Sequence, residues 1–196
     1  MVALAVGRTT LPHYAGIDPD APGLPGKIFL PVDELVPAPA DASAAFSAQL
    51  CQALPAKLSD FVAKIAVQDP ERAAARMEAL VAEKGVALCV LGLGPDGHIA
   101  FNQPGSGPDT RTRLVEILAQ NLSRLGDVTP AAHALTLGVA SLLSAERILL
   151  VVDGVGKEAA LERVLNGPES RDLPATFLRR HSDCHVFVVG ETESTR

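Results

Sequence analysis

The chain has few of the features that mark secreted, membrane or disulfide-rich proteins. Its three cysteines, Cys51, Cys89 and Cys184, are far apart and odd in number, which predicts a reducing compartment and no disulfide framework. No apolar run reaches the ~18 residues that a membrane-spanning helix needs. Residues 1–6 also lack the basic start and the long apolar stretch of a signal peptide. We therefore expect a cytoplasmic protein without a membrane partner.

Positive charge is scarce as well. The chain has 17 lysine and arginine residues against 23 acidic ones, a formal net charge of -6, which argues against a nucleic-acid partner. An anionic ligand would need a locally positive pocket, because the overall field does not attract it. His133, His181 and His185 lack the spacing with acids or cysteines that is typical of metal sites, so we expect no metal.

The composition is that of a folded globular protein. Hydrophobic residues make up 47% of the 196 residues and charged residues 20%. This length is enough for one α/β domain with a sizeable core. Because no internal repeat, low-complexity tract or linker interrupts the chain, we expect residues 1–196 to form a single domain.

Strand-like and helix-like segments alternate along the chain. This alternation predicts a doubly wound, mostly parallel sheet with helices on both faces, a Rossmann-like three-layer sandwich. The expected strands are residues 2–6, 27–30, 61–67, 86–91, 148–152 and 185–189. One helix is expected to begin near residue 11. The other expected helices span residues 42–54, 70–84, 135–143 and 157–165. Ligands of such sheets bind beyond the carboxyl ends of strands, where we expect loops 7–10, 31–35 and 92–106 to meet.

The densest chemical signal follows the strongest predicted strand, in residues 92–106. Its glycines allow tight turns and close approach of the backbone to a ligand. Asp96 and His98 lie two residues apart, and a carboxylate beside an imidazole can orient it and favour its charged form, which suits general acid–base catalysis. The alternative is a glycine-rich turn in which both side chains only cap backbone groups.

Residues 96–102, Asp-Gly-His-Ile-Ala-Phe-Asn, resemble the signature of glucosamine-6-phosphate deaminases. Those enzymes share a superfamily with the 6-phosphogluconolactonases, whose pattern has Asp-Gly-His but diverges after it. Phe101 and Asn102 therefore favour the deaminase branch. Further matches to the deaminases cover most of residues 2–190 and include residues 32–35, 111–113, 134–139 (similar to a helix of the family) and 154–157.

The resemblance implies a set of catalytic residues and no cofactor. His98 would assist opening of the sugar ring, Asp96 would orient and charge His98, and Asp33 would move a proton between C2 and C1 of the open sugar. Gln103 stands where the family has a glutamate that tunes the histidine. Ammonia and fructose 6-phosphate would be the products. Without the resemblance, Asp33 and Glu34 are an acidic pair at a strand end.

The resemblance also implies a site for phosphate and sugar. The candidates for binding are Gly7, Arg8, Thr9, Gly94, Arg124 and Lys157. Gly7 to Thr9 match a phosphate loop of the family, but Arg8 replaces a glycine, so it either adds a cation or blocks close backbone approach. The register of Arg124 is open, because a few residues are missing before it. Without the resemblance, the loop is an ordinary turn and Lys157 a lysine at a helix start.

Three departures from the family pattern bear on function. Gln103 keeps hydrogen-bonding capacity but loses the charge of the family's glutamate. The chain begins at the first strand, so we expect it to lack the family's N-terminal helix and much of its C-terminal tail. A sheet face left uncovered in this way would favour a homo-oligomer. Residues 111–130, which form a lid in the family, look shortened.

Three functions follow as hypotheses. The first is deamination and isomerisation of glucosamine 6-phosphate. The second is hydrolysis of a sugar lactone, in which His98 would activate water. The third is sugar-phosphate binding without turnover, motivated by Gln103 and Arg8, in which case Gln103→Glu would restore activity.

Overall fold

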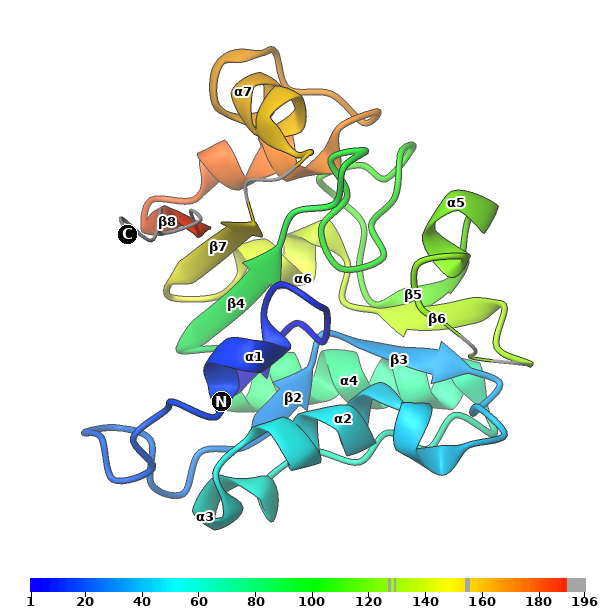
Figure 1. Cartoon of the computed structure of the whole chain (residues 1–196), viewed down its shortest axis with the longest axis vertical. Helices are drawn as coiled ribbons and strands as arrows, with labels where there is room; N and C mark the ends of the chain where they lie inside the picture. Colours follow the sequence, from blue (N-terminus) through cyan, green and yellow to red (C-terminus); the bar gives the residue numbers. More distant parts are fainter. Residues whose placement is uncertain (127, 129, 154–155, 190–196) are drawn as a thin grey trace, which may run out of the picture.

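The computed structural model describes residues 1–126, 128, 130–153 and 156–189, and its central feature is a parallel sheet (Figure 1). All neighbouring strands of this sheet run in the same direction. In spatial order the strands are β2 (Phe29–Pro31), β1 (Val2–Leu4), β4 (Leu88–Gly92), β7 (Ile148–Asp153) and β8 (Cys184–Val189). The predicted fold class is confirmed.

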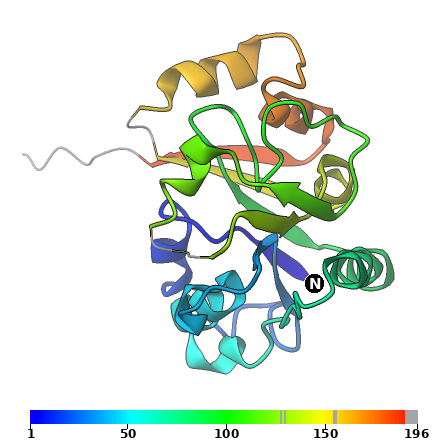
Figure 2. The same cartoon turned by 90° about the vertical axis from the view of Figure 1, so that its right-hand side faces the viewer.

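Helices cover both faces of the parallel sheet (Figure 2). One face packs against α1 (Leu11–Tyr14), α2 (Phe46–Ala53) and α3 (Ala56–Ser59). The other face packs against α4 (Pro70–Lys84), α6 (Val139–Leu143), α7 (Glu158–Asn166) and the 3-10 helix η2 (Pro174–Arg180). The long helix α4 starts as its sequence predicts, because the Asp69 side chain accepts a hydrogen bond from the Arg72 N–H and Pro70 occupies the first turn.

A second sheet of three antiparallel strands was not predicted. It has the order β3 (Asp33–Val36), β6 (His133–Thr136) and β5 (Arg113–Glu116). β3 follows β2 after a single residue, so the chain passes directly from the parallel sheet into this small sheet. The small sheet and α5 (Ala119–Leu122) enclose a separate apolar cluster that includes Leu35, Phe46 and Phe101.

The predicted helix over residues 135–143 is wrong in its first half. Residues 133–136 form β6, because both edges of this segment pair with neighbouring strands, and α6 begins only at Val139. The intervening Gly138 is extended, and a Cβ there would lie 2.2 Å from the Thr110 carbonyl oxygen. Within residues 134–139, which resemble a helix of the family, the first three residues therefore belong to β6 and only Val139 belongs to a helix.

Two other predicted elements differ from the structure. Residues 61–67 form no strand, since only Val62 makes a bridge to Phe29 at the edge of the sheet. The helix predicted over residues 42–54 is divided at Ala45, whose backbone is extended, into the 3-10 helix η1 (Ala42–Ala44) and α2. Part of the predicted 154–157 turn lies outside the described residues.

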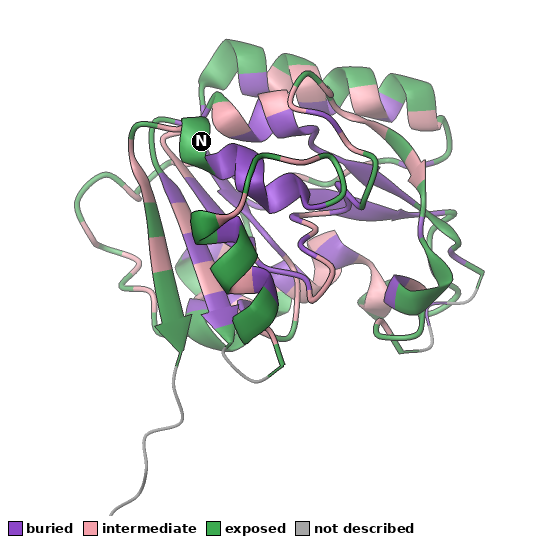
Figure 3. Ribbon diagram, turned by 90° about the horizontal axis from the view of Figure 1, so that it is seen from above, coloured by how far each residue is buried: buried purple, intermediate pink, exposed green. Residues whose placement is uncertain are grey.

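The edge strand β8 is much more exposed than the other strands of the sheet (Figure 3). Phe187 and Val188 are 54% and 56% exposed. The exposed apolar side chains of the sheet therefore lie along its edge strand β8. None of the described helices is both long and apolar enough to cross a bilayer.

Candidate active site

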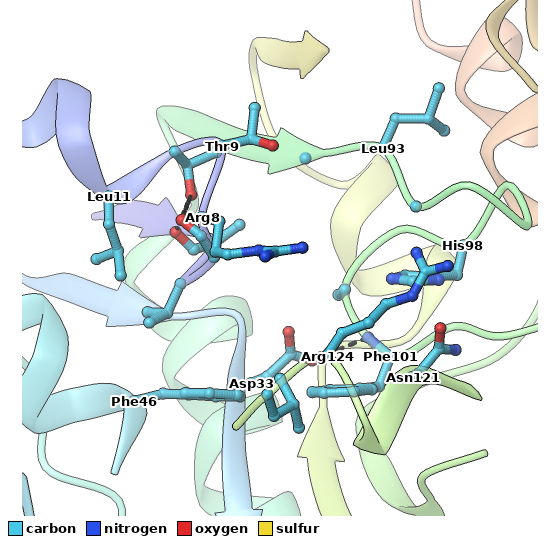
Figure 4. Close-up of a pocket in the computed structure, with 18 of the residues that line it drawn as sticks. Arg8, Thr9, Leu11, Asp33, Phe46, Leu93, His98, Phe101, Asn121 and Arg124 are labelled. Atoms are coloured by element: carbon cyan, nitrogen blue, oxygen red, sulfur yellow. Dashed lines mark hydrogen bonds between the residues drawn. The ribbon is translucent and has the colours of Figure 1, made fainter. Parts of the chain in front are cut away.

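The three loops predicted to meet do line one cavity, of about 290 Å³. Residues 7–10 follow β1, Asp33 begins β3, and residues 93–98 follow β4, so the cavity lies beyond the carboxyl ends of adjacent parallel strands. Figure 4 shows Arg8, Asp33, His98 and Arg124 around the same space. Segments more than 100 residues apart in the sequence thus supply one concave site.

His98 is held by a tight turn after β4. The Gly94 N–H donates to the His98 carbonyl oxygen (2.9 Å), and Gly97 has a φ of 75°. A Cβ at Gly94 would lie 2.2 Å from the imidazole ring, so only glycine fits beneath it. His98 Nδ1 lies 2.5 Å from Asp96 Oδ1, and the described residues offer Nε2 no hydrogen-bond partner. The ring therefore has one nitrogen fixed and the other available to a ligand.

The Asp96 carboxylate accepts further hydrogen bonds from the segment around α5. Gln120 Nε2 and Asn121 Nδ2 donate to Asp96 Oδ2 at 3.0 and 3.2 Å. Burial alone would raise the pKa of Asp96, but the hydrogen bond and charge of His98, with both amides, outweigh it and lower the pKa well below its usual range. Asp96 therefore stays ionised and holds the imidazole of His98 in one orientation. No motif in the sequence pointed to Gln120 or Asn121.

Gln103 is buried and lies behind Asp96 rather than against His98. Its Nε2 donates to the Glu116 carbonyl oxygen (2.8 Å), and its Oε1 accepts from the Leu118 N–H (2.8 Å) and from Asn121 Nδ2 (3.1 Å). Gln103 thus reaches Asp96 only through Asn121. Both Asn121 Nδ2 hydrogens are used, which fixes the amide and leaves its buried Oδ1 without a partner among the described residues.

Asp33 is the buried acid of the cavity, only 6% exposed at the start of β3. Its Oδ1 accepts a hydrogen bond from the Phe101 N–H (3.1 Å). Ala100, with a φ of 51°, makes the turn that presents this N–H. Burial raises the pKa of Asp33 from its ordinary 3.8 to about 7, although hydrogen bonds from Thr136 and Phe101 and the charge of His98 lower it. A carboxyl group in this range can both take and give a proton near neutral pH.

Three cations line the cavity wall near the phosphate-loop candidate. Lys157, at the start of α7, donates from Nζ to Thr9 Oγ1 (3.1 Å). Burial lowers the pKa of Lys157, and the nearby charges of Arg124 and Arg8 add to this effect, although the charge of Asp153 opposes it. Arg8 and Arg124 therefore face the same space as Lys157, although the overall charge of the chain is negative. Such a wall favours a compact anion such as phosphate.

The loop that carries Arg8 and Thr9 is anchored by side-chain hydrogen bonds to the Ala5 carbonyl oxygen. Thr10 Oγ1 and Tyr14 Oη both donate to the Ala5 carbonyl oxygen, at 2.8 and 2.7 Å. Gly7 accepts from the backbone N–H groups of Thr10 and Leu11. No group of histidine, cysteine and acidic side chains within the described ranges has the geometry of a metal site.

Comparison with known proteins gives a family and several relatives. The family model described as glucosamine-6-phosphate isomerases/6-phosphogluconolactonase matches residues 27–187. Glucosamine-6-phosphate deaminases of Exiguobacterium sibiricum and Rhodopirellula baltica are 36% and 39% identical over 64% and 63% of this chain. The chain spans about half the length of these two relatives, 52% and 51%. The deaminase of Bacillus cytotoxicus is 31% identical over 98% of this chain and 76% of its own length.

Two solved structures are similar over nearly the whole chain. A monomeric glucosamine-6-phosphate deaminase superposes with a TM-score of 0.83 at 27% identity, over 95% of this chain and 85% of its own. A 6-phosphogluconolactonase from Thermotoga maritima superposes with a TM-score of 0.75 at 25% identity, over 97% of this chain and 84% of its own.

Proposed function

The chain belongs to the glucosamine-6-phosphate isomerase/6-phosphogluconolactonase family, and from this membership we propose that it converts glucosamine 6-phosphate and water to fructose 6-phosphate and ammonia. The observation that carries the proposal is the pairing of a buried Asp33 with an oriented His98 in one cavity that also holds three cations. Isomerisation needs a base that later acts as an acid, and the raised pKa of Asp33 suits it to both tasks.

Phosphate binding fixes the substrate in the cavity in this proposal. Lys157, Arg124 and Arg8 neutralise the phosphate group, and the Gly7–Thr9 loop contributes backbone N–H groups and the Thr9 hydroxyl. The sugar then extends toward His98 and Asp33. The buried Asn121 Oδ1 at the cavity wall needs a donor, which a sugar hydroxyl or amino group supplies once Asn121 adjusts to the ligand.

Ring opening and isomerisation follow in the same cavity, at His98 and Asp33. His98, through Nε2, handles the proton of the ring oxygen while Asp96 holds Nδ1. The Asp33 carboxylate then takes the proton from C2 of the open-chain amino aldehyde and returns it to C1. One proton is taken up by O1 and one leaves the nitrogen, so that the C1=O double bond is replaced by a C2=N double bond. Water adds to the resulting imine carbon at C2 and ammonia leaves, so that one water is consumed for each ammonia released.

The structure of the cavity also bears on the lactonase hypothesis. A lactonase needs an activated water at His98 but no proton transfer between carbons. The burial of Asp33 and its raised pKa support the isomerase reaction, for which such a base is required. The cytoplasmic location expected from the sequence remains part of the proposal, supported by three free cysteines.

The test is a substrate panel on the purified chain. Glucosamine 6-phosphate, glucose 6-phosphate and 6-phosphogluconolactone are each supplied, and ammonia, ketose and acid formation are measured. We expect ammonia and ketose from the first substrate only, abolished in His98→Ala. The matched control is His185→Ala, because His185 also pairs with a carboxylate, Asp183, at 2.7 Å but lies outside the cavity.

Each other outcome selects a different function. Acid formation from the lactone above its spontaneous rate, without ammonia release, would select the lactonase. Tight binding of glucosamine 6-phosphate without any product would select a binding protein. Equal loss of activity in both histidine variants would contradict a specific role for the His98–Asp96 pair in the reaction.

A further inference from the structure

Thr136 is a buried polar residue to which neither the 92–106 motif nor the family resemblance assigns a role. It lies directly opposite Asp33 in the antiparallel pair of β3 and β6, and its relative exposure is 0%. The Phe101 N–H, which donates to Asp33 Oδ1 at 3.1 Å, lies equally 3.1 Å from Thr136 Oγ1. One backbone N–H therefore binds the carboxylate and the hydroxyl together.

The hydrogen of the Thr136 hydroxyl has two acceptors to choose from. One is the Asp33 carboxylate, which shares the Phe101 N–H with the hydroxyl and lies opposite it in the β3–β6 pair. The other is the Leu137 carbonyl oxygen, 3.4 Å away, which already accepts from Asn102 Nδ2 at 2.8 Å. The hydroxyl can turn between these acceptors by rotation about one bond, because a hydroxyl is a donor and an acceptor at once.

We propose that Thr136 is a positioning residue that follows the protonation state of Asp33 by rotation of its hydroxyl, and so serves the base in both halves of the proton transfer. This inference rests on the proposed function only for the identity of the reaction. The geometry around Asp33 stands without it.

In both protonation states of Asp33, the hydrogen-bond donors and acceptors around it can be paired without movement of heavy atoms. While Asp33 is ionised, the Thr136 O–H and the Phe101 N–H both donate to the carboxylate. When Asp33 has taken the proton from C2, its new O–H donates to Thr136 Oγ1, and the Thr136 hydrogen turns to the Leu137 oxygen. When the proton passes to C1, the hydroxyl turns back. No buried donor or acceptor of this group is left unpaired in either state.

Removal of the hydroxyl should act on Asp33 specifically. The other titratable groups that act on Asp33 come from several elements: His98 after β4, Glu34 on β3, Arg113 on β5 and Cys89 on β4. Thr136→Val keeps the shape and leaves all of them in place. It removes a donor to the charged carboxylate, and a hydrogen bond to a charged group is stronger than one to a neutral group.

The experiment compares pH profiles of kcat/KM for glucosamine 6-phosphate. In Thr136→Val we expect the acid limb to move to higher pH by roughly one unit, with KM changed less than kcat at pH 6. Thr136→Ser should restore the wild-type limb. Thr176→Val is the matched control, because Thr176 is also fully buried with a bonded hydroxyl but lies in η2, away from the cavity.

A second measurement does not depend on turnover. Carboxyl carbons of aspartate are labelled with ¹³C, the Asp33 signal is assigned by its loss in Asp33→Asn, and its titration is followed in wild type and Thr136→Val. An upward shift in the variant supports the inference even if no ammonia is formed, which would refute only the proposed function. Coincident titrations of folded wild type and Thr136→Val would overturn it, and Thr136→Ala replaces the valine variant if that variant does not fold.

Discussion

At the scale of single residues, the cavity wall brings together charges that repel one another. Lys157, Arg8 and Arg124 face the same space, and their mutual repulsion adds to the cost of burying the Lys157 ammonium. Lys157 also sits at the amino end of α7, where the helix dipole disfavours a cation. A bound phosphate relieves all three effects, so these local costs are typical of an anion site.

Replacement of the lysine should therefore weaken ligand binding more than it affects the fold. For Lys157→Met we expect the Kd for glucosamine 6-phosphate, measured by calorimetry, to rise roughly 10- to 100-fold, the loss of about 1.5–3 kcal/mol for a hydrogen bond to a charged group. The unfolding midpoint should stay the same or rise.

The matched control for this variant is Lys64→Met. Lys64 is an exposed lysine outside the cavity, so its replacement changes the net charge equally. An equal loss of affinity in both variants would mean that the overall charge, not the wall, governs binding.

At the scale of elements, the amino end of helix α2 is capped by a side chain from strand β3. Ala45 supplies no side-chain cap, but the buried Glu34 of β3 accepts from the Phe46 N–H (2.8 Å) and the Ser47 N–H (2.9 Å). This bond fixes Phe46, whose ring stacks on Phe101 with centroids 6.1 Å apart beside Asp33. Glu34 is thus a helix cap and a support of the cavity floor.

Glu34→Gln should lower the free energy of unfolding by about 1–3 kcal/mol. The amide places a donor against one of the N–H groups that now donate to the carboxylate. Urea unfolding measures the change, with Glu83→Gln, an exposed residue of α4, as the control that should alter it by less than ~0.5 kcal/mol. Equal stability of the two variants would show that α2 needs no cap from β3.

The segment from β5 to α5 depends in the same way on Gln103. Gln103 uses its amide as a donor to the Glu116 carbonyl oxygen and as an acceptor from the Leu118 N–H. A glutamate can accept from Leu118 and from Asn121 but cannot donate to Glu116, and its other oxygen would face that carbonyl oxygen. The sequence alone suggested that Gln103→Glu would restore a family feature, whereas these contacts predict the opposite.

We expect Gln103→Glu to lower both the unfolding midpoint and kcat. The loss should be about 1–3 kcal/mol in stability, because a buried carbonyl loses its donor, and activity should fall because repulsion between the new carboxylate and the Glu116 carbonyl oxygen displaces the side chain that holds Asn121. Gln52→Glu, at an exposed position of α2, makes the same chemical change as a control. A higher kcat in Gln103→Glu with an unchanged midpoint would contradict this account.

At the scale of the whole molecule, burial of Asp33 links activity to stability. Folding raises the pKa of Asp33 to about 7, so the folded state keeps a proton that the unfolded state releases above its ordinary pKa of 3.8. The contribution of Asp33 to stability is therefore fully present at low pH, decreases as the pH rises above about 4, and is lost once the pH passes about 7. The lowered pKa of Asp96 acts in the opposite direction, and its contribution is lost as the pH falls below about 4.

Asp33→Asn should consequently be inactive and, at alkaline pH, more stable than wild type. We expect the difference in unfolding free energy to be small at pH 4 and to grow to on the order of 2–4 kcal/mol at pH 8. Urea unfolding at several pH values measures it. Asp60→Asn, which changes an exposed aspartate, should show no such growth, and a pH-independent difference for Asp33→Asn would refute the link.

Local sequence was sufficient for the parallel sheet and for much of the cavity. Continuous apolar runs predicted β4 and β7, and the Asp69–Pro70 start and Gly85 stop predicted α4, because these signals act within a few residues. The loop that holds Asp96 and His98 was recognisable for the same reason. The rule that ligands bind beyond strand ends then brought Asp33 and Gly7 into the same site, and the family resemblance added Lys157.

Only the tertiary structure revealed the antiparallel sheet and the residues that support the site. β6 was predicted as a helix, because its segment gains strand structure only from β3 and β5 on either side. Thr136 meets Asp33 through that pairing, and Asn121 meets Asp96 through the fold of α5 over the motif. Partners brought together across 25 residues, as Asp96 and Asn121 are, or across 103, as Asp33 and Thr136 are, leave no periodic or local mark in a sequence. The chain by itself therefore determined which groups carry the chemistry, and the packing of distant segments decided their burial, orientation and charge.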